Sequence, residues 1–201
     1  MNVIAGTQGY AEEAEVLLRR YENIKLEDIH KDFLKFLPDP PAQVLDIGCG
    51  TGRDAAALAG LGYDVVAVEP VDELRDWAST SHASPRITWI NDHLPELEEV
   101  AGLHYAFDLI LMTAVWMHMD KPQRSSAMPV IAGMLKPGGR LMITTRHGPV
   151  PEGRQMFEVS ADETINLVRK CGLNEIHVLE RQPDKSKHPE VFWTRMAFEK
   201  K

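Results

Sequence analysis

Hydrophobic positions near the start of the chain recur at helical spacing. Ala14, Leu17 and Tyr21 follow one another at steps of three or four residues, which places them on one face of a helix. The prolines within residues 38–41 end this region, because proline lacks an amide donor and disfavours helix in the residue before it. We therefore expect an N-terminal helical cap over residues 1–37.

From residue 43 onward, short apolar runs alternate with helical segments. The apolar runs predict strands over residues 44–47, 64–68, 87–90, 107–112, 141–145, 175–179 and 191–198. The segments between them predict helices over residues 53–60, 72–79, 95–101, 121–135 and 161–171. Nearly continuous apolar strands that alternate with helices are typical of a mostly parallel sheet covered on both faces. The last two strands have no helix between them, so we expect an antiparallel, hairpin-like end.

Two local signals refine the helices, and the absence of a long linker sets the domain count. Ser160 and Glu163 have the spacing of a capping box, which predicts the start of the last helix. Pro129 lies inside the longest predicted helix, where it removes a hydrogen bond and favours a kink. No stretch is long enough to separate domains, so the pattern predicts one α/β domain with a three-layer, doubly wound sheet. Its expected parts are the cap over residues 1–37, a cofactor-binding core over 43–145 and a C-terminal part over 146–201.

A glycine-rich turn follows the first predicted strand. Gly48, Gly50 and Gly52 allow the backbone to turn tightly and bring a ligand close to the start of a helix. In a parallel sheet such a ligand lies outside the carboxyl ends of the strands. A nicotinamide or flavin site favours G-x-G-x-x-G, but Arg53 stands at the last position of that pattern. A phosphate-binding P-loop is not favoured either, since no Gly-Lys-Ser/Thr follows.

The stretch from Asp46 to Gly52 resembles the cofactor motif of class I S-adenosylmethionine-dependent methyltransferases. Other features follow in the order of that family: Glu69 ends the second strand, Asn91-Asp92 follow the third, and 135–139 read Leu-Lys-Pro-Gly-Gly before the fifth. The resemblance extends from about Val44 to Thr145. It implies a Rossmann-like methyltransferase fold, with a seven-stranded sheet whose last strand is antiparallel.

The resemblance also implies a role for each motif residue. Glu69 would accept hydrogen bonds from the ribose hydroxyls, and Asp92 from the adenine amine, with Leu94 among the residues of the adenine slot. Taken singly, these carboxylates are equally well interpreted as solvated loop residues. The candidate binding site for S-adenosylmethionine, and for its product S-adenosylhomocysteine, comprises Asp46, Gly48, Cys49, Gly50, Arg53, Glu69, Pro70, Asn91, Asp92, His93 and Thr113. Family members often cover this site with an N-terminal segment, which would bring Tyr10 over the cofactor.

Candidate catalytic residues follow the fourth and fifth predicted strands. His118 has an unperturbed pKa near neutrality and is a candidate general base; a histidine bonded to the backbone is the structural alternative. Trp116 is a candidate for stacking on the substrate, with a core position as the alternative. Arg146 is a candidate for binding an anionic group, helped by Arg154, with a surface ion pair as the alternative.

Missing motifs narrow the acceptor. The fourth strand is not followed by the Asp/Asn-Pro-Pro-aromatic sequence of enzymes that methylate exocyclic amines of bases or glutamine. The chain also lacks the Pro-Cys pair used for covalent attack on cytosine. The sequence therefore predicts methyl transfer to an O, N or S nucleophile of a small molecule. A non-catalytic protein that binds S-adenosylmethionine as a regulatory signal, and a nicotinamide-dependent oxidoreductase, remain alternatives.

Composition and charge agree with this prediction. The 201 residues include 22 Lys and Arg against 30 Asp and Glu, a net charge of −8 without a basic run, which argues against binding nucleic acid or an anionic membrane. We find no apolar stretch of membrane-spanning length and no secretory signal in residues 1–20. The two cysteines and eight histidines have no metal-ligand spacing, so we expect a reduced, cytoplasmic protein without a metal. The sequence does not indicate an oligomeric state.

Overall fold

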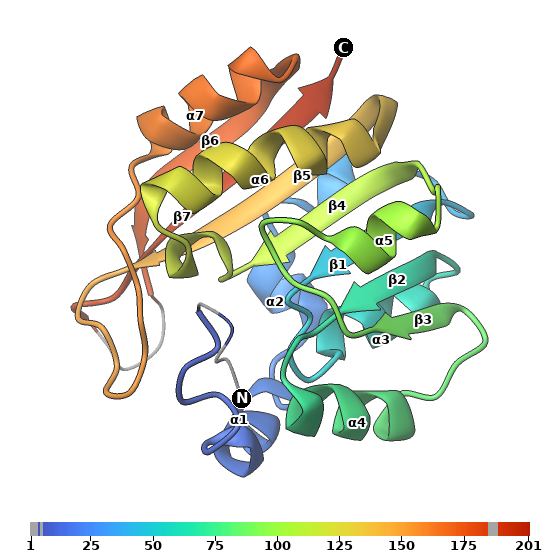
Figure 1. Ribbon diagram of the computed structural model, residues 1–201, viewed down its shortest axis with the longest axis vertical. Helices are drawn as coiled ribbons and strands as arrows, with labels where there is room; N and C mark the ends of the chain where they lie inside the picture. Colours follow the sequence, from blue (N-terminus) through green and yellow to red (C-terminus); the bar gives the residue numbers. More distant parts are fainter. Residues whose placement is uncertain (1–3, 5, 185–188) are drawn as a thin grey trace.

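Seven strands form one sheet in the computed structural model, which describes residues 4, 6–184 and 189–201 (Figure 1). The strands are β1 (Gln43–Ile47), β2 (Asp64–Val68), β3 (Ile87–Ile90), β4 (Phe107–Thr113), β5 (Leu135–His147), β6 (Leu173–Pro183) and β7 (Phe192–Lys200). The helices are α1 (Ala14–Tyr21), α2 (Leu26–His30), α3 (Arg53–Gly60), α4 (Asp72–Ser81), α5 (Glu98–Gly102), α6 (Lys121–Met134) and α7 (Ala161–Lys170), with short 3-10 helices η1 (Leu34–Phe36) and η2 (Trp116–His118).

The strand order confirms the predicted doubly wound sheet. The order is β3-β2-β1-β4-β5-β7-β6, and the first five strands along the chain are parallel to their neighbours within that group. Strand β7 lies between β5 and β6 and is antiparallel to both. Strand β1 pairs with β2 on one side and β4 on the other, so the strand order reverses there. A ligand is expected beside this reversal, at the carboxyl ends of β1 and β4.

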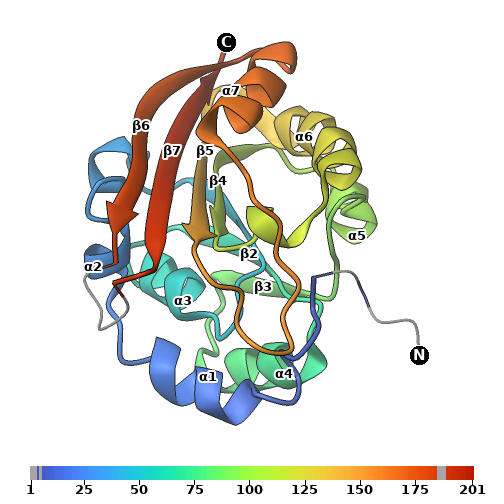
Figure 2. The ribbon, with the colours of Figure 1, turned by 90° about the vertical axis from the view of Figure 1, so that its left-hand side faces the viewer.

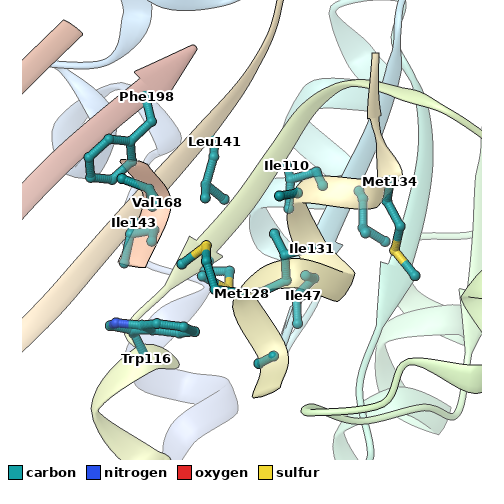
Figure 3. Packing of buried hydrophobic residues seen from close by; sticks show 14 of the residues in the cluster. Ile47, Ile110, Trp116, Met128, Ile131, Met134, Leu141, Ile143, Val168 and Phe198 are labelled. Carbon is teal, nitrogen blue, oxygen red and sulfur yellow. The ribbon is translucent and has the colours of Figure 1, made fainter. Parts of the chain in front are cut away.

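Helices cover both faces of the sheet (Figure 1). Helices α5, α6 and α7 pack on one face, where Met128, Ile131 and Val168 join a cluster with Ile110 and Ile143 (Figure 3). Segments from α2 and α3 pack on the other face, against β-strand residues of the opposite parity. The near-continuous apolar strands of the sequence thus reflect burial on two sides.

Some boundaries differ from the predicted ones. The N-terminal helical cap predicted over residues 1–37 contains α1, α2 and η1, and its residues 1–3 and 5 lie outside the described part. The helix predicted from residue 95 begins at Glu98, because Leu97 has a left-handed backbone with φ of 50°. Helix α6 continues through Pro129 to Met134.

The predicted capping box at the last long helix is only half formed. The Ser160 hydroxyl accepts the Glu163 N–H at 3.1 Å, but the Glu163 carboxylate accepts from Nε of Arg124 at 2.8 Å instead of returning to the cap. A complete box, which the sequence reading missed, starts α6, where Asp120 and Gln123 exchange side-chain-to-backbone hydrogen bonds. No helix in the described part of the chain is both long and apolar enough to cross a membrane.

Candidate active site

A cavity of about 1170 Å³ lies along the carboxyl ends of β1, β2, β4 and β5. Residues from the N-terminal segment and from the β6–β7 end complete its wall. Twelve of the fourteen residues predicted for the site line this one cavity: Asp46, Gly48, Cys49, Gly50, Arg53, Glu69, Pro70, Asp92, His93, Thr113, His118 and Arg146. Asn91 and Trp116 are not among the lining residues.

The glycine-rich turn requires glycine for two different reasons. Gly52 has a φ of +78°, and a Cβ there would lie 2.4 Å from Cη2 of Trp89, so the turn packs directly against β3. Gly50 also has a positive φ, of +58°, but a Cβ there would meet no atom within 4 Å. The turn is therefore tight against the protein at Gly52 and open at Gly50.

Three backbone amides of this turn donate hydrogen bonds within the protein. Cys49 N–H donates to the Val68 carbonyl at 2.9 Å, Gly50 N–H to the Glu69 carboxylate at 2.8 Å, and Gly52 N–H to the Cys49 carbonyl at 3.0 Å. A pyrophosphate needs free amides and no nearby anion. The carboxylate beside Gly50 makes this turn a poor pyrophosphate cradle.

Glu69 is fixed at the end of β2 by backbone donors. One carboxylate oxygen accepts from Gly50 and the other from Val71 N–H at 3.0 Å, and the residue is only 5% exposed. Burial raises the pKa of Glu69 to about 7, although the hydrogen bonds from the two backbone amides oppose that shift. Each oxygen keeps a second lone pair, so the carboxylate still has room for two hydroxyl donors from a ligand.

Asp46 carries a buried oxygen without a partner. Its Oδ2 has no hydrogen bond and the residue is 1% exposed in the cavity wall. Burial, together with the nearby carboxylate of Asp54, raises the pKa of Asp46 well above its usual range. An unpaired buried acceptor is costly, so this oxygen fits a ligand that brings a donor such as an ammonium group.

Asp54 and His30 form a buried pair that sequence reasoning missed. His30 Nε2 lies 2.7 Å from one Asp54 oxygen, and Arg53 Nε donates to the other at 2.8 Å. Burial alone would raise the pKa of Asp54, but the His30 and Arg53 contacts hold it below its usual range. The pair ties the cap to the first turn of α3. In the sequence, the one signal for this pair was an acidic residue, Asp54, in the alanine-rich helix predicted over residues 53–60.

The carboxylate of Asp92 is oriented by backbone amides at the third strand. One oxygen accepts from His93 N–H at 2.8 Å and the other from Val100 N–H at 3.0 Å. As in Glu69, each oxygen retains a lone pair for a ligand amine. Leu94 lines the cavity beside Asp92, whereas the Asn91 side chain is exposed and does not.

Trp116 is a core residue. It is fully buried in the same cluster as Met128 and Ile143 (Figure 3). Its indole N–H donates to the Thr164 hydroxyl at 3.1 Å, which satisfies the one polar atom of the ring. The expectation that Trp116 stacks on a substrate is therefore corrected: its ring faces the α6–α7 layer and does not line the cavity.

His118 is linked to the N-terminal segment. Its Nε2 lies 3.0 Å from the Tyr10 hydroxyl, and its Nδ1 lies 2.7 Å from the Gln155 carbonyl oxygen. Tyr10 also lines the cavity. The contact joins residues 108 positions apart, and the sequence analysis predicted no hydrogen-bond partner for Tyr10.

Arg146 and Arg154, which the sequence predicts near a substrate, differ in how many of their donors are used. Arg146 lines the cavity and donates one hydrogen bond, to the Pro149 carbonyl at 2.8 Å. The Arg154 guanidinium lies over the Tyr10 ring at 3.8 Å and donates to the Gln8 carbonyl. It also forms an ion pair with the carboxylate of Glu13, the residue before α1. Arg154 therefore holds the N-terminal segment, while Arg146 has donors left for a ligand.

The described residues include further metal-ligating and nucleophilic side chains, among them Cys49 and Cys171. Within the described ranges, no group of three or more His, Cys, Asp or Glu side chains is arranged to hold a metal ion. Both cysteines are free, and burial raises the pKa of Cys49 well above its usual range. Cys49 is therefore a neutral thiol at physiological pH.

Comparison with known proteins gives one consistent family. A family model described as a methyltransferase domain matches residues 18–184. An uncharacterized methyltransferase of Mycobacterium tuberculosis is 32% identical over 160 residues, which are 79% of this chain and 56% of the relative. The chain thus spans about half the length of that relative.

Solved structures agree in fold. The N-methyltransferase NodS of Bradyrhizobium japonicum, with bound S-adenosylhomocysteine, has a TM-score of 0.70 at 18% identity and covers 94% of this chain and 97% of its own. The 1,6-didemethyltoxoflavin-N1-methyltransferase of Burkholderia thailandensis has a TM-score of 0.65 at 21% identity, with coverage of 100% and 92%. At these identities the likeness concerns the fold.

Proposed function

This chain belongs to the methyltransferase-domain family, and we propose that it transfers a methyl group from S-adenosylmethionine to an O, N or S nucleophile of a small molecule. The observation that carries the proposal is the placement of Glu69. Its carboxylate is fixed by two amides beside an open glycine, in one cavity with Asp46 and Asp92. Three carboxylates in one cavity, two of them held by backbone amides, fit a ligand with hydroxyl, amine and ammonium donors.

The residues of the β1–β3 end fit S-adenosylmethionine. Glu69 would accept from the ribose hydroxyls, and Asp92 from the adenine amine beside Leu94. The unpaired oxygen of Asp46 would accept from the ammonium group of the methionine part. When bound, the cofactor supplies a methyl group whose bond to the positively charged sulfur breaks with both electrons going to sulfur.

The protein's remaining task is to align the acceptor and, where needed, to remove a proton. His118 would act as the base, and Arg146 would bind an anionic group of the acceptor through its remaining donors. The cavity volume of about 1170 Å³ exceeds the space of a typical single ligand, which supports a second molecule beside the cofactor. A small acceptor is also supported by the Burkholderia relative, whose structure holds 1,6-didemethyltoxoflavin.

The acidic charge of −8 supports a small molecule over a nucleic acid as partner. A cytoplasmic location remains a prediction of the sequence. The nicotinamide alternative is disfavoured by the carboxylate at the glycine turn, because a pyrophosphate there would meet Glu69.

Calorimetric titration with S-adenosylmethionine and with S-adenosylhomocysteine tests the proposal. We expect heat of binding and a rise in melting temperature with both compounds. No heat and no thermal shift with either would discard the function, and stabilisation by NADH alone would revive the oxidoreductase. Tight cofactor binding with no turnover of any acceptor, unaffected by His118→Ala or Arg146→Ala, would favour a non-catalytic binder.

A further inference from the structure

The hydrogen bonds of His118 fix where its proton lies. The Gln155 carbonyl oxygen, 2.7 Å from Nδ1, can only accept, so Nδ1 carries the hydrogen. In a neutral ring Nε2 then holds a lone pair, and the Tyr10 hydroxyl, 3.0 Å away, must donate to it. The result is a directed chain from the Tyr10 hydroxyl through His118 to the backbone.

The surroundings keep this chain in one geometry. The Arg154 guanidinium covers the Tyr10 ring at 3.8 Å, and the Tyr10 and His118 rings meet edge to face at 78°. A Cβ at Gly6 would lie 2.8 Å from Cβ of His118, so the N-terminal segment runs in close contact with η2. In Figure 2 this segment and the loop after β5 lie side by side, near the carboxyl ends of the strands.

We propose that Tyr10 and His118 form a proton relay. The methyl acceptor is then a compound whose nucleophilic atom carries a proton, such as a hydroxyl or an amine. The inference rests on the proposed function. Both side chains line the cavity, and the Tyr10 oxygen keeps a lone pair that can accept from an acceptor O–H or N–H. A nucleophile without a proton would not need the hydrogen-bonded series from Tyr10 through His118 to Gln155.

The step conserves protons and electron pairs. The acceptor atom contributes the electron pair of its new bond to carbon and gives its proton to the Tyr10 oxygen. The Tyr10 hydroxyl gives its own proton to Nε2 of His118. Tyr10 ends neutral, and His118 ends as an imidazolium that still donates from Nδ1 to Gln155.

The protonation states before the step suit this direction. Burial lowers the pKa of His118 and the nearby Arg154 cation lowers it further, against the opposing effect of the hydrogen bond to Gln155, so the ring is a neutral base at physiological pH. Burial raises the pKa of Tyr10, as do Tyr21, Glu69 and Glu13, against the opposing effect of Arg154. Tyr10 therefore passes a proton on rather than resting as a phenolate.

The first test reads the histidine directly, without an acceptor. In the full chain loaded with S-adenosylhomocysteine, nitrogen-15 spectra of labelled histidine should show His118 protonated at Nδ1 and free at Nε2. Tyr10→Phe keeps the ring but removes the donor, so the Nε2 resonance should move to that of a nitrogen without a hydrogen bond. Tyr63→Phe is the matched control: it removes a hydroxyl that donates to the Pro38 carbonyl at 2.6 Å, outside the cavity, and should leave His118 unchanged. A proton on Nε2, or a Tyr10→Phe spectrum like wild type, would overturn the relay.

The second test measures release of S-adenosylhomocysteine with phenol, catechol and aniline as acceptor probes. For a probe that wild type methylates, Tyr10→Phe should lower kcat by roughly 100-fold, the usual size of a lost proton-transfer group, and leave cofactor affinity unchanged. The loss should shrink at a pH that ionises a phenolic probe. An equal rate in both proteins would refute the relay. Wild type that fails to bind S-adenosylhomocysteine would instead refute the proposed function.

Discussion

The two ends of the cavity are built in different ways. At the β1–β3 end, Glu69 and Asp92 are held by backbone amides no more than nineteen residues away in sequence. At the β4–β7 end, the contacts join distant segments: Tyr10 to His118 over 108 residues and Arg154 to the Gln8 carbonyl over 146. One end is a local motif, whereas the other exists only after the whole chain has folded.

This difference matches what each end has to do. In the proposed function the β1–β3 end binds the cofactor, and short-range backbone hydrogen bonds hold the two carboxylates that would receive it. An acceptor pocket made from the N-terminal segment and the loop after β5 can change without disturbing the sheet. We therefore expect substitutions at the first end to act on cofactor affinity and those at the second on protein mobility or turnover.

The largest expected effect belongs to neither end. Trp116→Ala should lower the free energy of unfolding by about 3–5 kcal/mol, because it removes a fully buried ring and its bond to Thr164. Urea titration measures the loss. Trp193→Ala, at a half-buried position of the cavity wall, is the contrast and should cost less. An equal loss of unfolding free energy in the two variants would show that the buried Trp116 ring stabilises the fold no more than a half-buried tryptophan does.

At the cofactor end, Glu69→Ala should weaken S-adenosylhomocysteine binding by about 1–3 kcal/mol, since hydrogen bonds to a charged group are removed. Glu69→Gln keeps an acceptor oxygen and should fall between that variant and wild type. Glu73→Ala, at an exposed position on α4, is the control and should bind normally in the same calorimetric titration. Unchanged affinity in Glu69→Ala would remove this carboxylate from the site.

The raised pKa of Glu69, about 7, predicts how cofactor affinity depends on pH. Below that pKa the carboxyl of the free protein holds a proton, which must leave before it can accept from two hydroxyls. Affinity for S-adenosylhomocysteine should therefore fall as pH drops below 7, by up to about tenfold per unit, or about 1.4 kcal/mol. Calorimetry at pH 6 in buffers of different ionisation enthalpy should detect proton release in wild type and less of it in Glu69→Gln. Equal release in both proteins would assign the titration to another group.

The smallest effect concerns the N-terminal segment. Arg154→Ala removes the cation over Tyr10 and should release residues 6–13 at a cost of about 0.5–2 kcal/mol. Hydrogen exchange should become faster in that segment and stay unchanged at β1. Arg19→Ala, which removes an exposed arginine near Glu15, is the control. If exchange in residues 6–13 were the same in Arg154→Ala and wild type, the arginine would not hold the segment.

The sequence predicted which residues of the β1–β3 end line one cavity because the signals there are local. Apolar periodicity marked the buried strands, and the residues from Asp46 to Gly52 lie on one continuous turn. Strand β6 was predicted too short, over residues 175–179 instead of 173–183, because it is an edge strand whose polar, exposed residues hide the alternation. Strand β5 was also predicted too short, over residues 141–145 instead of 135–147. Its first part, which contains two glycines, was not recognised as strand, although Leu135 pairs with Phe107.

The acceptor end was beyond such reasoning for a physical reason. His118 was identified as a candidate base, but its partner Tyr10 comes from a segment that only tertiary packing brings there. Trp116 shows the opposite failure, since an aromatic beside a site residue has the same sequence signal whether it faces the cavity or the core. Burial decides between these positions, and burial is a property of the folded chain.

A crystal structure with S-adenosylhomocysteine tests the central claim most directly. We predict the ribose hydroxyls within hydrogen-bonding distance of the Glu69 carboxylate, the adenine beside Asp92 and the amino group facing Asp46. A nucleoside bound elsewhere in the protein, or a ribose turned away from Glu69, would contradict it.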